Sequence, residues 1–111
     1  MKRYCFALDL QDDPELIEEY KGYHGEKIWP EVLDAALDHG VVSEEIYLAG
    51  NRLFMILQTR DDFSLDAKRA ADSSNPRMQE WEKLMWRFQK ALPFAKPGEK
   101  WVAMEKIFEV K

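Results

Sequence analysis

The chain has 111 residues, of which 46% are hydrophobic and 13% are aromatic, and its formal net charge is -5 at pH 7. This length suits one domain over residues 1–111, and the apolar content is enough for a packed core and excludes wholesale disorder. Its basic residues are scattered, which argues against nucleic acid and an anionic membrane as partners, because both need a clustered cationic surface.

The N-terminus bears on where the protein works. It begins with two basic residues and a short apolar stretch, as a signal peptide does, but Asp9 interrupts that stretch and no small-residue cleavage site follows. No apolar segment approaches the ~20 residues of a spanning helix. Cys5 is the only cysteine, so no internal disulfide can form. The cytoplasm is therefore the expected location.

The N-terminal part of the chain predicts a strand followed by two helices. Residues 3–10 alternate between two faces in the pattern of a strand. Asp13 and Pro14 then indicate a helix start, and this helix is expected to end near His24. A second helix is expected to begin near Pro30 and to end at about residues 39–40, where a glycine follows a histidine.

The remainder predicts a hairpin, two more helices and a last strand. The hairpin strands are expected over 41–48 and 52–59, and a short helix is expected over 63–71. The next helix, from about 75 to 92, carries an apolar stripe of Met78, Trp81, Leu84, Met85 and Phe88. With a final strand over 101–110, the order predicts a ferredoxin-like βαββαβ domain of the α+β class, with its helices on one sheet face.

The sheet face without helices predicts an association between copies of the chain. An uncovered apolar sheet face is an interaction surface or a liability, and a two-fold homodimer is the commonest way to cover it. Trp86 lies off the apolar stripe and is a candidate contact in this homodimer.

Three side chains in the segment 18–32 are the first candidates for chemistry. Tyr20 and His24 are four residues apart, so they share one face of a helix, and Trp29 follows shortly after. A phenol, an imidazole and an indole can hold a sugar and move protons at neutral pH. Each also has a structural interpretation: a histidine at a helix end, a core tyrosine, and a tryptophan packed at the next helix start.

The other candidates are weaker. The position of Trp81 on the apolar stripe is typical of core packing, and Glu82 and Glu44 belong to a chain with 21 acidic residues, most of which are expected to be solvated. A glycine-rich phosphate loop, a cysteine cluster and an HExxH motif are all absent, so no cofactor or metal is expected.

Over nearly its whole length the chain resembles the rhamnose mutarotase family, and more closely its fucose-type branch. The resemblance is carried by YCFALDLQDDPELIEEY, by the tyrosine and histidine followed by IWPEV, and by IYLAGNRLFMIL, NPRMQEWEKLMWRFQ and LPFAKPGEKWVAMEKIF. It implies a dimeric α+β barrel that interconverts the α and β anomers of a 6-deoxyhexose without cofactor or metal. A small-molecule monosaccharide and a second copy of the chain are the partners it implies.

The resemblance also assigns roles to residues. The family's catalytic histidine falls on His24, its substrate-binding tyrosine on Tyr20, and the first of its paired tryptophans on Trp81. General acid/base catalysis by His24 would open and close the sugar ring, and one such group is worth ~10²–10⁴ in rate. Tyr20, Glu82 and water all remain candidates for the second proton carrier.

Three departures from the rhamnose-type pattern concern the sugar. Four residues separate His24 from Trp29 where three are expected, so Gly25 is an insertion at the site entrance. Glu82 replaces the second tryptophan of the pair, and Glu44 replaces a further tyrosine. The substrate-binding set is thus Tyr20, Trp81, Trp29, Glu82 and Glu44, and L-fucose is favoured over L-rhamnose. The alternatives are a cofactorless oxygenase of the dimeric α+β barrel type and a non-catalytic binding dimer.

Overall fold

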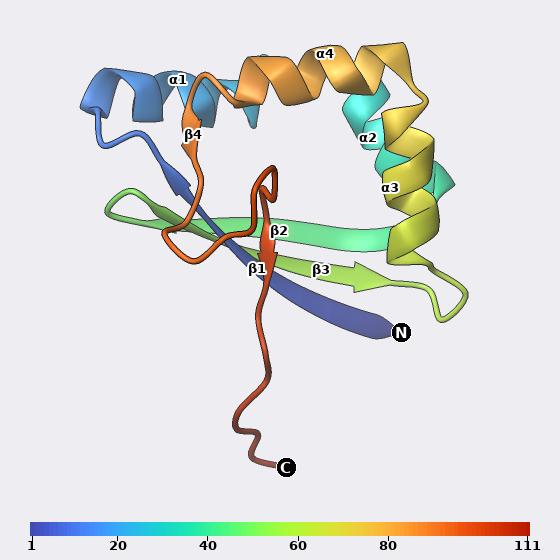
Figure 1. The fold of residues 1–111 in the computed structure, drawn as a ribbon. Helices are drawn as coiled ribbons and strands as arrows, with labels where there is room; N and C mark the ends of the chain where they lie inside the picture. Colours follow the sequence, from blue (N-terminus) through green and yellow to red (C-terminus); the bar gives the residue numbers. More distant parts are fainter.

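The computed structural model describes all 111 residues and contains one antiparallel sheet with four helices on one side of it (Figure 1). The elements are β1 (Lys2–Leu10), α1 (Pro14–Tyr23), α2 (Pro30–Asp38), β2 (Val41–Ala49), β3 (Arg52–Thr59), α3 (Leu65–Ser73), α4 (Pro76–Met85), β4 (Gln89–Lys90) and β5 (Val102–Ala103). The strand order is β2-β3-β1-β4, and β5 also pairs with β1. The expected α+β fold with an antiparallel sheet is confirmed. None of the helices combines the length and apolarity needed to cross a membrane.

Local signals in the sequence set the helix starts. Asp13 caps α1 by accepting hydrogen bonds from the backbone N–H groups of Glu15 and Leu16, at 2.9 and 3.2 Å. Ser64 caps α3 and Asn75 caps α4 in the same way. A proline occupies the first turn of α1, α2 and α4, where its fixed φ suits a helix and its missing N–H costs nothing.

The strand register divides the sheet into two faces. Side chains on the helix side form the inner face, and those on the other side form the open face. The inner face carries Tyr4, Phe6, Leu8 and Leu10 of β1, Leu53, Met55 and Leu57 of β3, and Glu44, Ile46 and Leu48 of β2. The open face carries Cys5, Ala7 and Asp9 of β1, Arg52, Phe54 and Ile56 of β3, and Glu45 and Tyr47 of β2.

Two apolar clusters hold the helices against the inner face. The larger one buries Leu10, Tyr20, Leu53, Trp81, Met85 and Phe88 between β1, β3, α1 and α4. The smaller one buries Phe6, Val41, Leu57 and Phe63 near the other end of the sheet. Trp101 packs against both clusters, so the segment before β5 bridges them. The apolar stripe of α4 is therefore used as core packing, as its periodicity indicates.

The C-terminal third corrects two sequence expectations. α4 ends at Met85 rather than near 92, because the N–H groups of Arg87 and Phe88 bond three residues back, to the Leu84 and Met85 carbonyls, in a tight turn. That turn still buries Phe88 fully, which is why the apolar stripe predicts a longer helix than the chain forms. The fourth sheet position is taken by β4, and strand pairing in the expected 101–110 segment covers only Val102 and Ala103.

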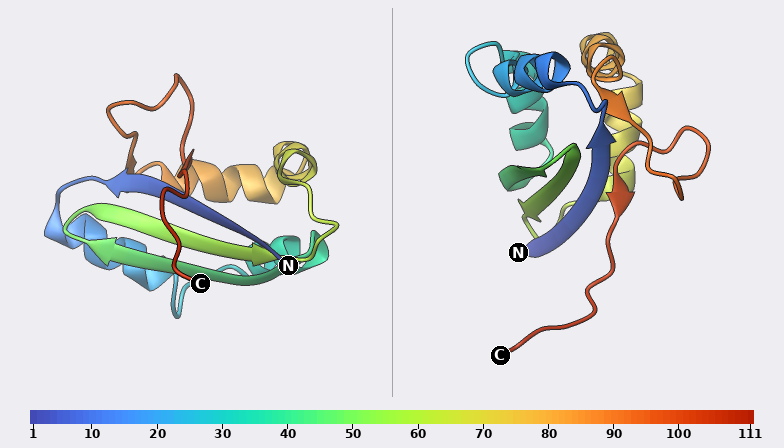
Figure 2. Two further views of the ribbon diagram at one scale, coloured as in Figure 1. Left: turned by 90° about the horizontal axis from the view of Figure 1, so that it is seen from below. Right: turned by 90° about the vertical axis from the view of Figure 1, so that its left-hand side faces the viewer.

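Residues 104–111 form a C-terminal tail that leaves the sheet on the side away from the helices (Figures 1 and 2). Its one backbone hydrogen bond to the sheet runs from the Met104 N–H to the Cys5 carbonyl, at 2.8 Å. Beyond that point Ile107 is 89% exposed and Phe108 is 77% exposed. The apolar pattern over 101–110 thus predicts a long strand of which only Val102 and Ala103 pair with the sheet.

Candidate active site

A cavity of about 690 Å³ lies between the inner face and the helices. Its wall is mostly apolar, with a few polar groups converging on it, which is the usual composition of a small-molecule site. Five of the six residues proposed from the sequence line this cavity: Tyr20, His24, Glu44, Trp81 and Glu82. Trp29 is not among the lining residues, and the neighbouring Ile28 is.

His24 stands at the end of α1 with its tautomer fixed. It is the C-cap residue, and its Nδ1 lies 3.0 Å from the Tyr20 carbonyl oxygen. Because a carbonyl only accepts hydrogen bonds, Nδ1 carries the proton, and Nε2 of the neutral ring keeps a free lone pair. Part of the His24 residue is exposed to solvent. The protein atoms packed around the ring still remove some of its hydration, and this lowers the pKa of His24 below 6.5. A neutral imidazole with a free Nε2 is a proton acceptor.

Tyr20 lies beside this ring and is a proton donor. It is buried, and its ring centroid is 4.4 Å from that of His24. The pKa of Tyr20 is raised to about 12, mainly by burial and in smaller part by the charges of Glu44 and Glu82, while a hydrogen bond from Gln89 opposes the rise. The phenol therefore keeps its proton at neutral pH. The cavity thus pairs a base and an acid in adjacent rings.

Gln89 is a site residue that the sequence interpretation missed. Its Nε2 donates to the Tyr20 hydroxyl oxygen at 3.2 Å, and its side chain lines the cavity. The sequence predicts this residue inside the last helix, over about 75 to 92, where a glutamine carries no signal. Only the early end of α4, with β4 starting at residue 89, brings it to the inner face.

An aromatic wall stands against the His24 ring. Trp81, from α4, has its ring centroid 5.8 Å from that of His24, and it is 7% exposed. Trp29 packs against Trp81 at 5.1 Å, and the Arg77 guanidinium lies over the Trp29 ring at 3.7 Å. Trp29 and Arg77 therefore support Trp81 and leave the cavity surface to Trp81 itself.

The two glutamates that depart from the rhamnose-type pattern both line the cavity. Glu44 lies on the inner face, and burial raises its pKa while the charge of Lys68 opposes that rise. Glu82 is paired with Lys100, whose Nζ lies 2.6 Å from a carboxylate oxygen. Lys100 comes from the segment before β5, so this ion pair joins α4 to the C-terminal part of the chain. The two carboxylates place hydrogen-bond acceptors on the cavity wall.

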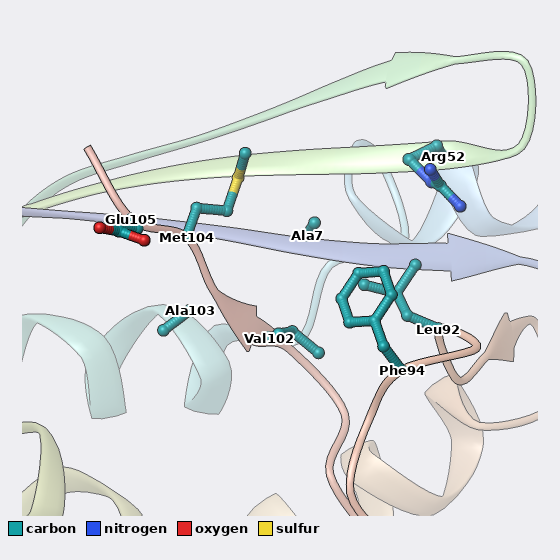
Figure 3. A pocket seen from close by; sticks show the side chains of 8 residues that line it. All are labelled: Ala7, Arg52, Leu92, Phe94, Val102, Ala103, Met104 and Glu105. Carbon is teal, nitrogen blue, oxygen red and sulfur yellow. The ribbon is translucent and has the colours of Figure 1, made fainter. Parts of the chain in front are cut away.

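A second hollow of about 360 Å³ lies on the open face (Figure 3). Phe94 and Leu92 stand beside Ala7 of β1 and Arg52 of β3, and Met104 closes another side. This hollow is mainly apolar and contains no histidine or tyrosine. Its lining does not offer the acid and base found in the cavity. No group of three His, Cys, Asp or Glu side chains in the chain is arranged to hold a metal ion.

Comparisons with known proteins define first the class of fold. The crystal structure of an L-rhamnose mutarotase from Formosa agariphila superposes with a TM-score of 0.72 at 20% identity, covering all of both chains. Tetracenomycin F2 cyclase from Streptomyces glaucescens superposes with a TM-score of 0.69 at 17% identity, covering 100% of this chain and 98% of the cyclase. At these identities the two structures show a shared α+β fold.

The sequence comparisons then define the family. An L-fucose mutarotase from Xanthomonas campestris is 46% identical over 109 residues, covering 97% of this chain and 87% of the relative. An L-rhamnose mutarotase from Jannaschia is 35% identical over 83 residues, covering 73% of each chain. The L-rhamnose mutarotase family model matches residues 3–110. The chain belongs to the L-rhamnose mutarotase family, which confirms the resemblance and the expected enzyme class, an isomerase. The roles of individual residues stay predictions.

Proposed function

We propose that this protein interconverts the α and β anomers of a free 6-deoxyhexose, with L-fucose favoured over L-rhamnose. The observation that carries the proposal is the pairing of a neutral His24, whose Nε2 is free, with a protonated Tyr20 at a centroid distance of 4.4 Å in one cavity. Mutarotation needs one group that takes a proton and one that gives a proton. These two rings meet that need.

The proposed reaction balances with these two groups alone. Nε2 of His24 takes the proton of the anomeric hydroxyl, the bond between C1 and the ring oxygen breaks, and its electron pair stays on the ring oxygen. Tyr20 donates its phenolic proton to that oxygen, which gives the open aldehyde. The aldehyde turns about the C1–C2 bond, and the same transfers in reverse close the ring on the other face and restore both residues.

The preference for L-fucose rests on Glu44 and Glu82. Both line the cavity, and a carboxylate can accept hydrogen bonds from two hydroxyls, which a tryptophan or a tyrosine cannot. L-fucose and L-rhamnose differ in the configuration of their ring hydroxyls. A site that pairs with one hydroxyl pattern loses binding when the other pattern leaves a buried polar group unpaired. Trp81 would then contact a C–H face or the C6 methyl.

Saturation-exchange NMR tests this function directly. With either sugar at anomeric equilibrium, irradiation of one anomeric proton should transfer saturation to the other, and added protein should accelerate the transfer for L-fucose more than for L-rhamnose. Metal chelator in the buffer should change neither rate. Faster exchange of L-rhamnose would overturn the sugar assignment. Exchange no faster than in buffer for a panel of 6-deoxyhexoses would overturn the mutarotase proposal.

We also propose that the protein acts as a homodimer, in the cytoplasm, and that a second copy covers the open face. That face presents Phe54, Ile56 and Tyr47, the last of which is 53% exposed. The C-terminal tail adds further apolar side chains that find no place in their own protomer. Burying both against a copy would remove an apolar surface that is costly to leave in water. Light scattering at micromolar concentration should give a dimer mass, and a monomer mass would contradict the proposal.

A further inference from the structure

Gln89 has a feature that the proposed reaction does not yet use. The residue is 3% exposed, and its side-chain carbonyl oxygen, Oε1, is buried with no hydrogen-bond partner. It is the one buried side-chain oxygen or nitrogen in the chain that lacks a partner. Buried polar atoms in proteins are nearly always paired, so an exception on a cavity wall indicates an acceptor that a ligand satisfies.

The backbone holds this side chain in place. Gln89 pairs with Leu10 across β4 and β1, and its main-chain carbonyl accepts a hydrogen bond from Gln11 at 3.1 Å. The side-chain amide is therefore presented to the cavity from a fixed strand and not from a mobile loop. Preorganised polar groups of this kind contribute more to recognition than groups that must be ordered on binding.

The other half of the amide acts on Tyr20. Nε2 of Gln89 donates to the Tyr20 hydroxyl oxygen at 3.2 Å. An oxygen that accepts this hydrogen bond directs its own O–H elsewhere, and Tyr20 lines the same cavity. When the phenol gives up its proton, the N–H of Gln89 remains to stabilise the phenolate that forms. The amide thus sets the direction of the proton donor.

We propose that Gln89 both positions Tyr20 and binds the sugar: Nε2 keeps the Tyr20 hydroxyl pointing into the cavity as a donor, and Oε1 accepts a hydrogen bond from a ring hydroxyl of the substrate. This inference rests on the proposed function and deepens it. It adds a neutral acceptor to the two carboxylates that line the site. It also explains why a glutamine, which offers a donor and an acceptor at once, stands beside the proton donor.

Three variants test the two halves separately. Gln89→Met keeps the length of the side chain and removes both polar atoms, so kcat/KM for L-fucose should fall on the order of 10²-fold, with kcat lowered and KM raised. Gln89→Glu keeps an acceptor and loses the N–H donor, so kcat should fall while KM changes by less than about threefold. Gln58→Met makes the first substitution on the open face and should leave both constants at wild-type values.

Deoxy sugars provide a second readout that a purely structural role would not move. The 2-, 3- and 4-deoxy analogues of L-fucose each lack one ring hydroxyl, and their exchange is compared with the uncatalysed rate of the same sugar. With the wild-type protein, one of the three analogues should be accelerated much less than L-fucose. With Gln89→Met, that analogue and L-fucose should be accelerated equally, because the variant has already lost the contact with that hydroxyl. If each analogue loses the same factor with both proteins, or if Gln89→Met exchanges L-fucose like the wild type, the inference is wrong.

The same experiment separates this inference from the proposed function. Absence of accelerated exchange in the wild-type protein defeats the mutarotase proposal, whatever Gln89 does. Accelerated exchange that is unchanged in both Gln89 variants defeats only the role of Gln89. If Gln89→Met does not fold, as judged by its thermal transition, Gln89→Glu and the deoxy analogues with wild-type protein decide: unchanged kcat together with equal losses for all three analogues overturns the inference.

Discussion

The two faces of the sheet are built from the same strands and have opposite characters. On the inner face, helices enclose a cavity in which burial moves the pKa values of Tyr20, His24 and Glu44 from their usual values. On the open face, the Arg52 guanidinium is exposed and bonds to both oxygens of the buried Asp9 at 2.8 and 3.1 Å, so the charge is paired there. Because successive strand residues point to opposite faces, a single substitution can alter the chemistry or the association and leave the other unchanged.

The largest effect is expected from removing the inner-face base. His24→Ala should lower anomer exchange by ~10²–10⁴-fold, because it removes the proton acceptor, while the fold and the dimer persist. The chain offers a matched control. His39 ends α2 as His24 ends α1, with Nδ1 2.9 Å from the Ala35 carbonyl oxygen, but it does not line the cavity.

Exchange rates and light scattering of both alanine variants check this prediction. His39→Ala should exchange L-fucose like the wild type, since it loses the same kind of helix-end hydrogen bond without touching the site. A His24→Ala protein that remains folded and exchanges normally would remove His24 from the mechanism. If the wild-type protein does not accelerate exchange and His24→Ala only weakens sugar binding, the non-catalytic binding dimer is supported instead.

The next effect should appear on the open face. Phe54 is flanked by Ala7 and Tyr47 in the register, so Phe54→Arg places a charge in the middle of the proposed interface and should raise the dimer Kd roughly 30-fold or more. Sedimentation across a concentration series measures it, with Ala70→Arg on the exposed side of α3 as control. Exchange per protomer should change by less than about threefold. An unchanged Kd would place the interface elsewhere, including at Trp86.

The strands and helices around these two faces were predicted from the sequence to different degrees. Alternation along β1 and β3 predicted both strands closely, and the cap residues predicted the starts of α1 and α4. The segment 101–110 is predicted as one long strand, but only Val102 and Ala103 pair with β1, because an apolar pattern does not say where a partner strand is available. Local signals therefore predicted the elements, while the pairing of the C-terminal segment depended on the assembled sheet.

The site was predictable only where residues had a chemical signature. Tyr20, His24, Trp81, Glu44 and Glu82 were named from spacing and resemblance, and all line the cavity. Trp29 was also expected at the site, but Ile28 lines the cavity in its place, because a sequence cannot show which of two adjacent residues turns inward. Gln89 carries no signal in the sequence, since its place at the cavity shows only in its contact with Tyr20, 69 residues away along the chain.

A pH profile would sharpen the view that burial tunes the inner face. Because loss of hydration lowers the pKa of His24, the base stays neutral below 6.5, and kcat/KM should begin to fall only at a pH under that value. Below that pKa the fall should approach tenfold per pH unit. No alkaline decline is expected until near pH 12, where Tyr20 ionises. An acidic limb centred above 6.5 would show that His24 is not desolvated in the free enzyme.

The smallest effect should come from Glu44, and it concerns stability. Burial raises the pKa of this carboxyl above 4.5, so the folded state holds its proton more tightly than the unfolded state does. The charged form is therefore a cost to the fold, fully present above the folded pKa and absent below 4.5. Glu44→Gln should raise the free energy of unfolding at pH 7 by less than about 1 kcal/mol, a limit set by the solvent that still reaches the carboxylate.

Urea unfolding of both proteins at pH 7 and pH 4 measures that difference. The gain should be seen at pH 7 and should shrink at pH 4, where the wild-type carboxyl is largely protonated. Glu45→Gln is the matched control, because the adjacent side chain lies on the open face and should show no such gain. A loss of stability at pH 7 would mean that the attraction between Glu44 and Lys68 outweighs the burial of the charge. The cavity wall would then hold Glu44 as an ion-pair partner, leaving Glu82 and Gln89 as the main acceptors for the sugar.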